Sequence, residues 1–281
     1  ARSGEVAEEA DDVGKRTGGQ WGGLVAFFGL GAVKMERGDI EGAMTDVDRV
    51  GESAKDESFP PGAFLGVVVA WLRINAGDAD GAVDAGENAR ERSKELTPVG
   101  GPALMVLGKA LAQRGDMDRA DVVIAEAMEA DASGHRDLSG GFEIARTIIG
   151  EFLAGRGRYK EALAYSGERL IALEEFQRRS FVSDFLRAKG LALAGLGRPE
   201  EAEEPLNRAV EVARDIGSVR SQWRALAAQA EVAAALGDRK TSTEARLRAM
   251  QIVDGIVEGI GDSERRAMFL SLPEVVKLRA G

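Results

Sequence analysis

The sequence predicts an all-α protein, a solenoid of about six helical hairpins with capping helices at its ends. Three observations predict it: a glycine turn recurs every 38 to 42 residues, two columns of small residues keep its register, and apolar residues on both sides follow a helical period. The turn glycines are Gly38, Gly77, Gly115, Gly157, Gly197 and Gly237.

Each hairpin needs the glycine and the small residues for a physical reason. Glycine adopts the left-handed conformation cheaply, so it ends the first helix of a pair and lets the chain reverse. Small side chains let two backbones approach closely, and a large one there would cost about 1–3 kcal/mol in overpacking. Five residues after each glycine stand Ala43, Ala82, Ala120, Ala162, Ala202 and Ser242, and seven before it stand Gly31, Ala70, Gly108, Gly150, Gly190 and Ala230.

Composition excludes several classes of protein. The 281 residues carry a net charge of −10, with no cysteine and one histidine, His135. Disulfides, thiol nucleophiles and metal sites of cysteines or several histidines are therefore excluded. The acidic balance disfavours nucleic acid and anionic lipid, and the longest apolar runs, such as residues 62–72, are too short to span a bilayer. We expect a cytoplasmic location, no membrane contact, no nucleic acid, no metal and no cofactor.

Three regions follow one another along the chain. Residues 1–19 predict one helix, either the second helix of a preceding repeat or an N-terminal cap. Residues 20–260 predict the six hairpins, and residues 261–281 predict a C-terminal capping helix. The unpaired ends indicate a part excised from a longer protein. In the third hairpin the apolar period is carried by Leu104, Leu107 and Leu111 before the turn and by Val123, Ile124 and Ala127 after it.

Residues 20–260 resemble a tetratricopeptide repeat (TPR) array, whose unit is a helix-turn-helix with small residues at these same three places. The resemblance implies a right-handed solenoid. The units are longer than the standard 34 residues, similar to the long repeats of bacterial signalling ATPases and adenylate-cyclase-like regulators. A bulky residue is expected eleven positions before each turn glycine, but Gly66 and Arg146 depart from this pattern.

No group of residues assembles into a catalytic site. His135 lies in a polar loop without a nucleophile or an orienting acid, which favours a solvated histidine. The glycines of residues 18–23 follow no predicted strand and precede no Lys-Ser/Thr pair, so they form no phosphate loop. Basic residues between positions 156 and 189 alternate with acids, as on a salt-bridged surface. We expect no enzyme and no catalytic residue.

A binding surface is expected on the concave face, which the first helix of each TPR pair lines. Positions thirteen, ten, six and three before the turn glycine form one stripe there, because they cluster on the helix wheel. The stripe is apolar in the first two repeats and carries charge in the last two. The apolar binding candidates are Val25, Phe28, Met35, Phe64, Val67, Trp71, Ile74 and Met105, and the polar candidates are Glu151, Asp184, Arg187, Arg224 and Glu231.

Two interpretations of the apolar candidates stay open. In one, residues 20–112 form an exposed cradle for a helix, a peptide or a small molecule, because large exposed apolar patches usually mark binding surfaces. In the other, the stripe packs internally, under a tightly coiled superhelix or under the N-terminal helix. Lys34 and Arg73 lie on the side assigned to packing and leave the helix rotation open. The carboxylate clamp of chaperone-binding TPR modules is not supported at its groove positions.

The resemblance implies a non-enzymatic scaffold that binds a protein or a peptide through its concave face. The context it implies is the regulatory segment of a larger bacterial signalling or transcription regulator. The alternative is a solenoid that senses a small-molecule effector, similar to the inducer domain of maltose-type activators. A homodimer is a further candidate, because the ends of a solenoid expose apolar edges.

Overall fold

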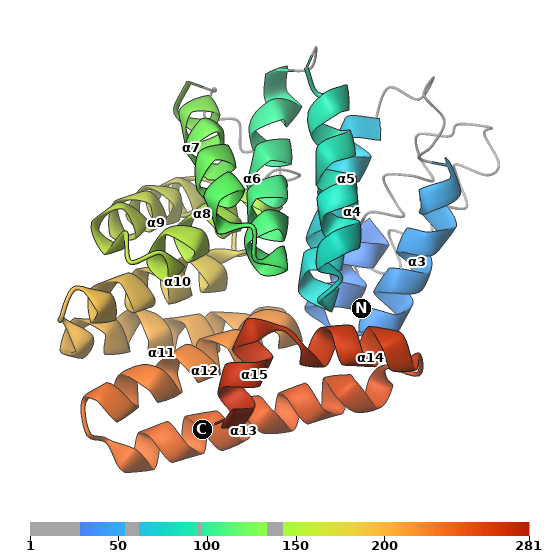
Figure 1. The fold of residues 1–281 in the computed structure, drawn as a ribbon. Helices are drawn as coiled ribbons and strands as arrows, with labels where there is room; N and C mark the ends of the chain where they lie inside the picture. The colour runs from blue at the N-terminus through green and yellow to red at the C-terminus, as the bar shows by residue number, and fades with distance from the viewer. Residues whose placement is uncertain (1–28, 54–61, 95–96, 134–142, 281) are drawn as a thin grey trace.

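A computed structural model describes residues 29–53, 62–94, 97–133 and 143–280. Every secondary-structure element within these ranges is helical. The predicted helix in residues 1–19, the candidates Val25 and Phe28, and His135 lie outside the described residues. The prediction of an all-α solenoid is confirmed (Figure 1).

The helices pair in chain order around the predicted turn glycines. Residues 29–36 are helical and precede the turn at Gly38. The pairs that follow are α4 with α5, α6 with α7, α8 with α9, α10 with α11 and α12 with α13. The bounds are α3 Ile40–Ser53, α4 Gly62–Ala76, α5 Ala79–Arg92, α6 Thr97–Arg114, α7 Met117–Ser133, α8 Glu143–Gly155, α9 Tyr159–Glu175, α10 Val182–Gly195, α11 Pro199–Ile216, α12 Val219–Ala235, α13 Arg239–Gly259, α14 Ser263–Leu270 and α15 Pro273–Ala280.

All six turn glycines adopt positive φ angles, between 73° and 94°. At the second turn the N–H of Gly77 donates to the carbonyl of Ile74, and that of Asp78 donates to Arg73, which is the Schellman pattern. Asp78 then caps the next helix by accepting from the N–H of Gly81 at 2.9 Å. One Gly-Asp pair therefore ends one helix and begins the next.

The small-residue columns lie where helices touch. A Cβ added to Gly108 would stand 2.6 Å from Cγ1 of Ile124, and one added to Gly190 would stand 2.6 Å from Cγ of Leu206. Both contacts join the two helices of one hairpin. The column after the turn is fully buried at Ala43, Ala82, Ala120, Ala162 and Ala202.

The two departures from the bulky column have structural causes. A Cβ at Gly66 would lie 2.8 Å from that of Ala89, so α4 and α5 approach too closely for a larger residue. Arg146 is buried, and its guanidinium donates to Asp131 at 2.8 Å and to Glu143 at 3.1 Å. A buried ion pair therefore replaces the apolar contact.

The first helices form an inner layer and the second helices an outer layer. Packing is continuous from α4 to α6, α8, α10 and α12, each first helix lying against the next. The stack turns as it proceeds, from upright helices in α3–α7 to nearly horizontal ones in α11–α13 (Figure 1). Inward-facing residues of the first helices therefore converge, and we call the surface that they form the inner wall.

The C-terminal helices return to the first pairs and close the curve (Figure 1). A Cβ at Gly38 would lie 2.9 Å from Cγ1 of Ile256 in α13, and one at Gly77 would collide with the main-chain carbonyl of Met268 in α14. Arg265 in α14 donates to Glu41 and, at 2.6 Å, to Asp48, both in α3. We call the contacts of α14 with α3 and with the turn at Gly77 the clasp.

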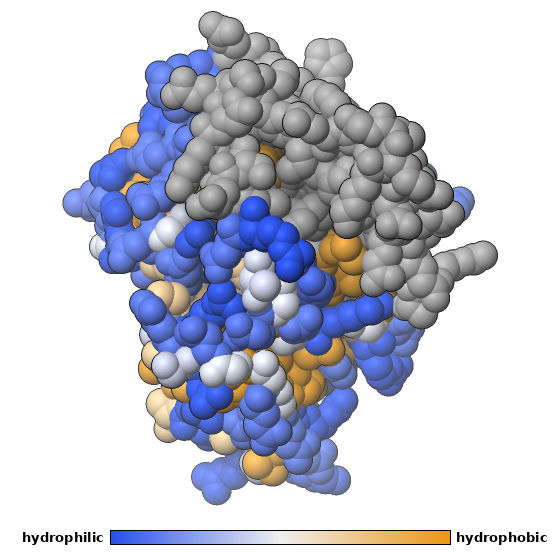
Figure 2. All heavy atoms as spheres, turned by 90° about the vertical axis from the view of Figure 1, so that its right-hand side faces the viewer, coloured by the Kyte–Doolittle hydropathy of each residue, from blue (hydrophilic) through white to orange (hydrophobic). Residues whose placement is uncertain are grey.

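The face on the clasp side is mostly hydrophilic over its described atoms, with small hydrophobic patches (Figure 2). Among the helices that the structure describes, none is long and apolar enough to cross a membrane.

Lys34 and Arg73, which left the helix rotation open in the sequence, form ion pairs within their own hairpins. Lys34 pairs with Asp46 at 2.5 Å, and Arg73 pairs with Asp78.

Candidate binding site on the inner wall

Five of the predicted apolar candidates that the structure describes are closed to solvent. Met35, Val67, Trp71, Ile74 and Met105 are each at most 3% exposed, and Phe64 is partly buried. All of the five belong to the main hydrophobic core. This placement favours internal packing over an open cradle in the closed solenoid.

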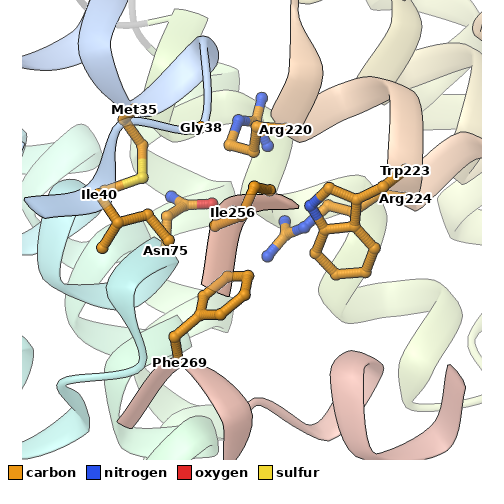
Figure 3. A pocket seen from close by; sticks show the side chains of 9 residues that line it. All are labelled: Met35, Gly38, Ile40, Asn75, Arg220, Trp223, Arg224, Ile256 and Phe269. Carbon is orange, nitrogen blue, oxygen red and sulfur yellow. The ribbon is translucent and has the colours of Figure 1, made fainter. Parts of the chain in front are cut away.

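Side chains of α12 and α14 cover part of the apolar stripe. Trp71 lies under the guanidinium of Arg220, whose Cζ is 5.2 Å from the ring centroid. Met35, Asn75, Trp223 and Phe269 surround a gap of about 10 Å³ between the first pairs, α12 and α14, which has room for about one water molecule (Figure 3).

Two of the charged candidates, Arg187 and Arg224, gather around the carboxylate of a third, Glu151 in α8. It accepts from Nζ of Lys109 at 2.5 Å and from Nη2 of Arg187 at 2.5 Å. Nη1 of Arg224 lies 3.6 Å from the same carboxylate. Helices α6, α10 and α12 thus each direct one cation toward α8.

Three cations dominate the ionisation of Glu151. Burial would raise the pKa of this carboxyl, but the positive charges of Lys109, Arg187 and Arg224 outweigh it and hold the pKa well below the usual 4.5. Burial likewise would lower the pKa of Arg187, but Glu151 and Asp184 raise it. Glu151 is therefore an anion at neutral pH.

A second ion cluster joins the middle of the solenoid to its first pair. Arg220 donates to Asp184 at 2.9 Å and to Glu36 at 2.8 Å. Ser221 also donates to Asp184, at 3.2 Å. These hydrogen bonds hold α10, α12 and residues 29–36 together.

A cavity of about 200 Å³ lies beside the Glu151 cluster. Its walls come from α6, α8, α12 and the turn between α14 and α15. The apolar lining includes Ile74, Met117, Phe152 and Leu272, and the polar lining comprises Lys109, Gln113, Glu151, Arg156, Arg224 and Glu274. Arg156 pairs with Asp121 at 2.5 Å on the outer side, so its charge is already neutralised.

Arg224 differs from its neighbours in having no hydrogen-bond acceptor among the described residues. Only 6% of the residue is exposed, and its Nε has no partner. Its nearest carboxylate oxygens belong to Glu151 at 3.6 Å and Glu274 at 3.8 Å. It stacks on Trp223, with Cζ 5.5 Å from the ring centroid, and it lines both the cavity and the small gap.

The stripe brings together Glu151, Asp184, Arg187 and Arg224 but not Glu231. Glu231 is exposed and pairs with Lys277 of α15 at 2.7 Å. Sequence reasoning omitted Arg220, which lies one helical turn before Arg224 and extends the same stripe. It also omitted Glu36, Gln113 and Glu274; of these, Glu274 lies in the capping helices, outside any repeat register.

The fold and this inner wall define a TPR-like helical-repeat protein. No protein-family model and no curated protein matches the chain. Among solved structures, the crystal structure of Rap protein complexed with competence and sporulation factor is similar, with a TM-score of 0.62 and 14% sequence identity. The match covers 92% of this chain and 74% of that chain. At this identity the likeness concerns the fold alone.

Proposed function

We propose that this protein is a non-enzymatic scaffold that binds a short peptide, or an exposed segment of a protein partner, on its inner wall. The cavity of about 200 Å³ beside Arg224 carries the proposal. It combines an apolar lining with polar groups that converge from several helices, which is the usual composition of a ligand site.

The volume of the cavity limits the size of the ligand that it can hold. Sites for drug-sized ligands span roughly 300–1,000 Å³, so this cavity suits one or two residues and not a helix. We do not propose a helix-binding cradle for the closed solenoid, because the apolar candidates that the structure describes, apart from the partly buried Phe64, are in the core.

The similar solved structure supports the binding of a separate partner by this fold. That structure contains Rap protein with competence and sporulation factor bound, so a solenoid of this fold holds a separate factor. We propose the same type of role here, as the sensing or docking segment of a bacterial signalling or transcription regulator.

A thermal-shift experiment tests the function. A pool of short peptides should raise the melting temperature, because a ligand that binds only the folded state stabilises it. The variant Ala112→Trp, which fills the cavity, should lose that rise, while Ala235→Trp on the exposed end of α12 should keep it. A rise that survives in Ala112→Trp would contradict binding at this site.

A small-molecule sensor is the second candidate. The observation in its favour is that the turn between α14 and α15 covers one side of the cavity, as Leu272, Pro273 and Glu274 line it. Sugars and nucleotides in the same thermal-shift assay test it. Stabilisation by one of these classes, with none from peptides, would replace the scaffold by the sensor.

A further inference from the structure

We propose that the inner-wall cavity binds a carboxylate group of its ligand through the guanidinium of Arg224, and that Glu274 competes for the same guanidinium. This inference rests on the proposed function and names the chemistry of the ligand. Three independent features of the described residues support it: the unsatisfied donors of Arg224, the charge around the cavity, and the position of Glu274.

The donors of Arg224 require an acceptor. A guanidinium has five N–H groups in a planar fork that matches the two oxygens of a carboxylate. Buried donors without acceptors are costly, so almost all of them are paired in folded proteins. Arg224 is 6% exposed, yet both carboxylates near it stand beyond hydrogen-bond distance, at 3.6 and 3.8 Å. Because it lines the cavity, a ligand there can supply the missing acceptor.

The charge around the cavity leaves a place for one anion at Arg224. Lys109, Arg187 and Arg224 face Glu151, so three positive charges surround one negative charge. In the adjoining cluster Arg220 is shared by two carboxylates, Asp184 and Glu36. With Glu274 in place the two clusters hold four cations and four carboxylates, so a ligand carboxylate that displaces Glu274 from Arg224 keeps the charge balanced.

Glu274 lies where a ligand carboxylate would approach. It is in the first turn of α15, partly exposed, and its carboxylate is 3.8 Å from Nη2 of Arg224. It therefore reaches the inner wall from the capping helices and not from a repeat. An ion pair at this distance is weak enough for a ligand to exchange.

The rest of the cavity selects an apolar group attached to the carboxylate. Ile74, Met117, Phe152 and Leu272 line it, and each presents aliphatic, thioether or aromatic surface. A hydrophobic residue carrying a terminal carboxylate satisfies both halves of the site. An acidic side chain supplies the same carboxylate without the adjacent apolar group.

The experiment compares four probes at constant ionic strength and pH 7: N-acetyl-leucine, N-acetyl-leucinamide, N-acetyl-glutamic acid α-amide and inorganic phosphate. Binding is followed by thermal shift and by the NMR cross-peak of Arg224 Nε–Hε, which its loss in Arg224→Gln assigns. N-acetyl-leucine should bind roughly tenfold more tightly than its amide, because a charged hydrogen bond is lost in the amide. Tighter binding of the glutamic acid derivative would assign the side-chain carboxylate as the ligand group.

Two variants keep the test decisive. Glu274→Gln removes the competing charge and should tighten N-acetyl-leucine binding about two- to fivefold. Glu264→Gln, the same change at an exposed position of α14, should leave it unchanged. If Arg224→Gln unfolds and leaves the cross-peak unassigned, the affinities of the four probes and the Glu274→Gln result still decide.

The proposal is overturned if the amide or phosphate binds as well as N-acetyl-leucine, if the Arg224 cross-peak does not move, or if Glu274→Gln does not tighten binding. Failure of the proposed function gives a different pattern of results from failure of this inference. Peptides that bind without any preference for a carboxylate would uphold the scaffold and reject this inference. Binding of N-acetyl-leucine without binding of any peptide would uphold this inference and reject the scaffold.

Discussion

Glu151 is the residue on which the inner wall depends most. Its replacement by Gln keeps the shape but leaves Lys109, Arg187 and Arg224 facing one another without the central anion. We expect a loss of about 3 kcal/mol in the free energy of unfolding at pH 7, measured by urea denaturation. The exposed Glu201→Gln, which loses a surface pair with Arg198, should leave the urea midpoint almost unchanged, because solvent screens that pair.

The lowered pKa of Glu151 predicts that the stability of the protein depends on pH. The folded state holds the pKa of Glu151 well below its usual 4.5. Stability from this carboxylate is therefore complete above the usual pKa and declines as the pH falls below it. The difference in unfolding free energy between wild type and Glu151→Gln should narrow between pH 5 and pH 3. A difference that stays constant over this range would show that Glu151 is not held as an anion by its neighbours.

Replacing two glycines by alanine tests the close helix contacts, because the two changes should shift stability in opposite directions. Gly190→Ala should destabilise the protein by about 1–3 kcal/mol, because the new Cβ would stand 2.6 Å from Leu206 Cγ. Gly167→Ala in α9 should stabilise it by about 0.5–1 kcal/mol, since an added Cβ would meet nothing within 4 Å beyond its chain neighbours and its own helix backbone, and alanine favours helix. Thermal melts of the two variants check both signs, and equal signs would reject the packing explanation.

At the scale of elements, the hairpins could be predicted from sequence and the clasp could not. Gly77 shows why. Its role in ending α4 follows from local chemistry that recurs in every unit, so the repeat reveals it. Its second role, close contact with the Met268 carbonyl in α14, joins residues far apart in the chain and is not part of the repeated unit.

The clasp has a testable consequence for dynamics. Arg265→Ala removes the hydrogen bonds from α14 to Glu41, Thr45 and Asp48 of α3. We expect faster hydrogen exchange in α3 and α14, with little change in α10 and α11, because local opening follows local contacts. Arg198→Ala, which breaks an exposed pair at the start of α11, is the control. Uniform acceleration over all helices in Arg265→Ala would contradict a local clasp.

For the whole molecule, the candidate site was predictable only in part. The charged stripe of the later repeats placed Glu151, Arg187 and Arg224 together, because helical period and repeat register are properties of sequence. Whether Trp71 and Met105 face solvent depends on how far the solenoid curves and on what returns to cover it. Both depend on contacts such as Trp71 with Arg220, which no single repeat contains.

The central claim is that the inner wall performs the recognition, and hydrogen–deuterium exchange with the most stabilising peptide of the pool tests it most directly. We predict protection in α6, α8, α12 and the first turn of α15, the elements that contribute Lys109, Glu151, Arg224 and Glu274 to the cavity. Protection confined to the outer helices α7, α9, α11 and α13 would contradict the account.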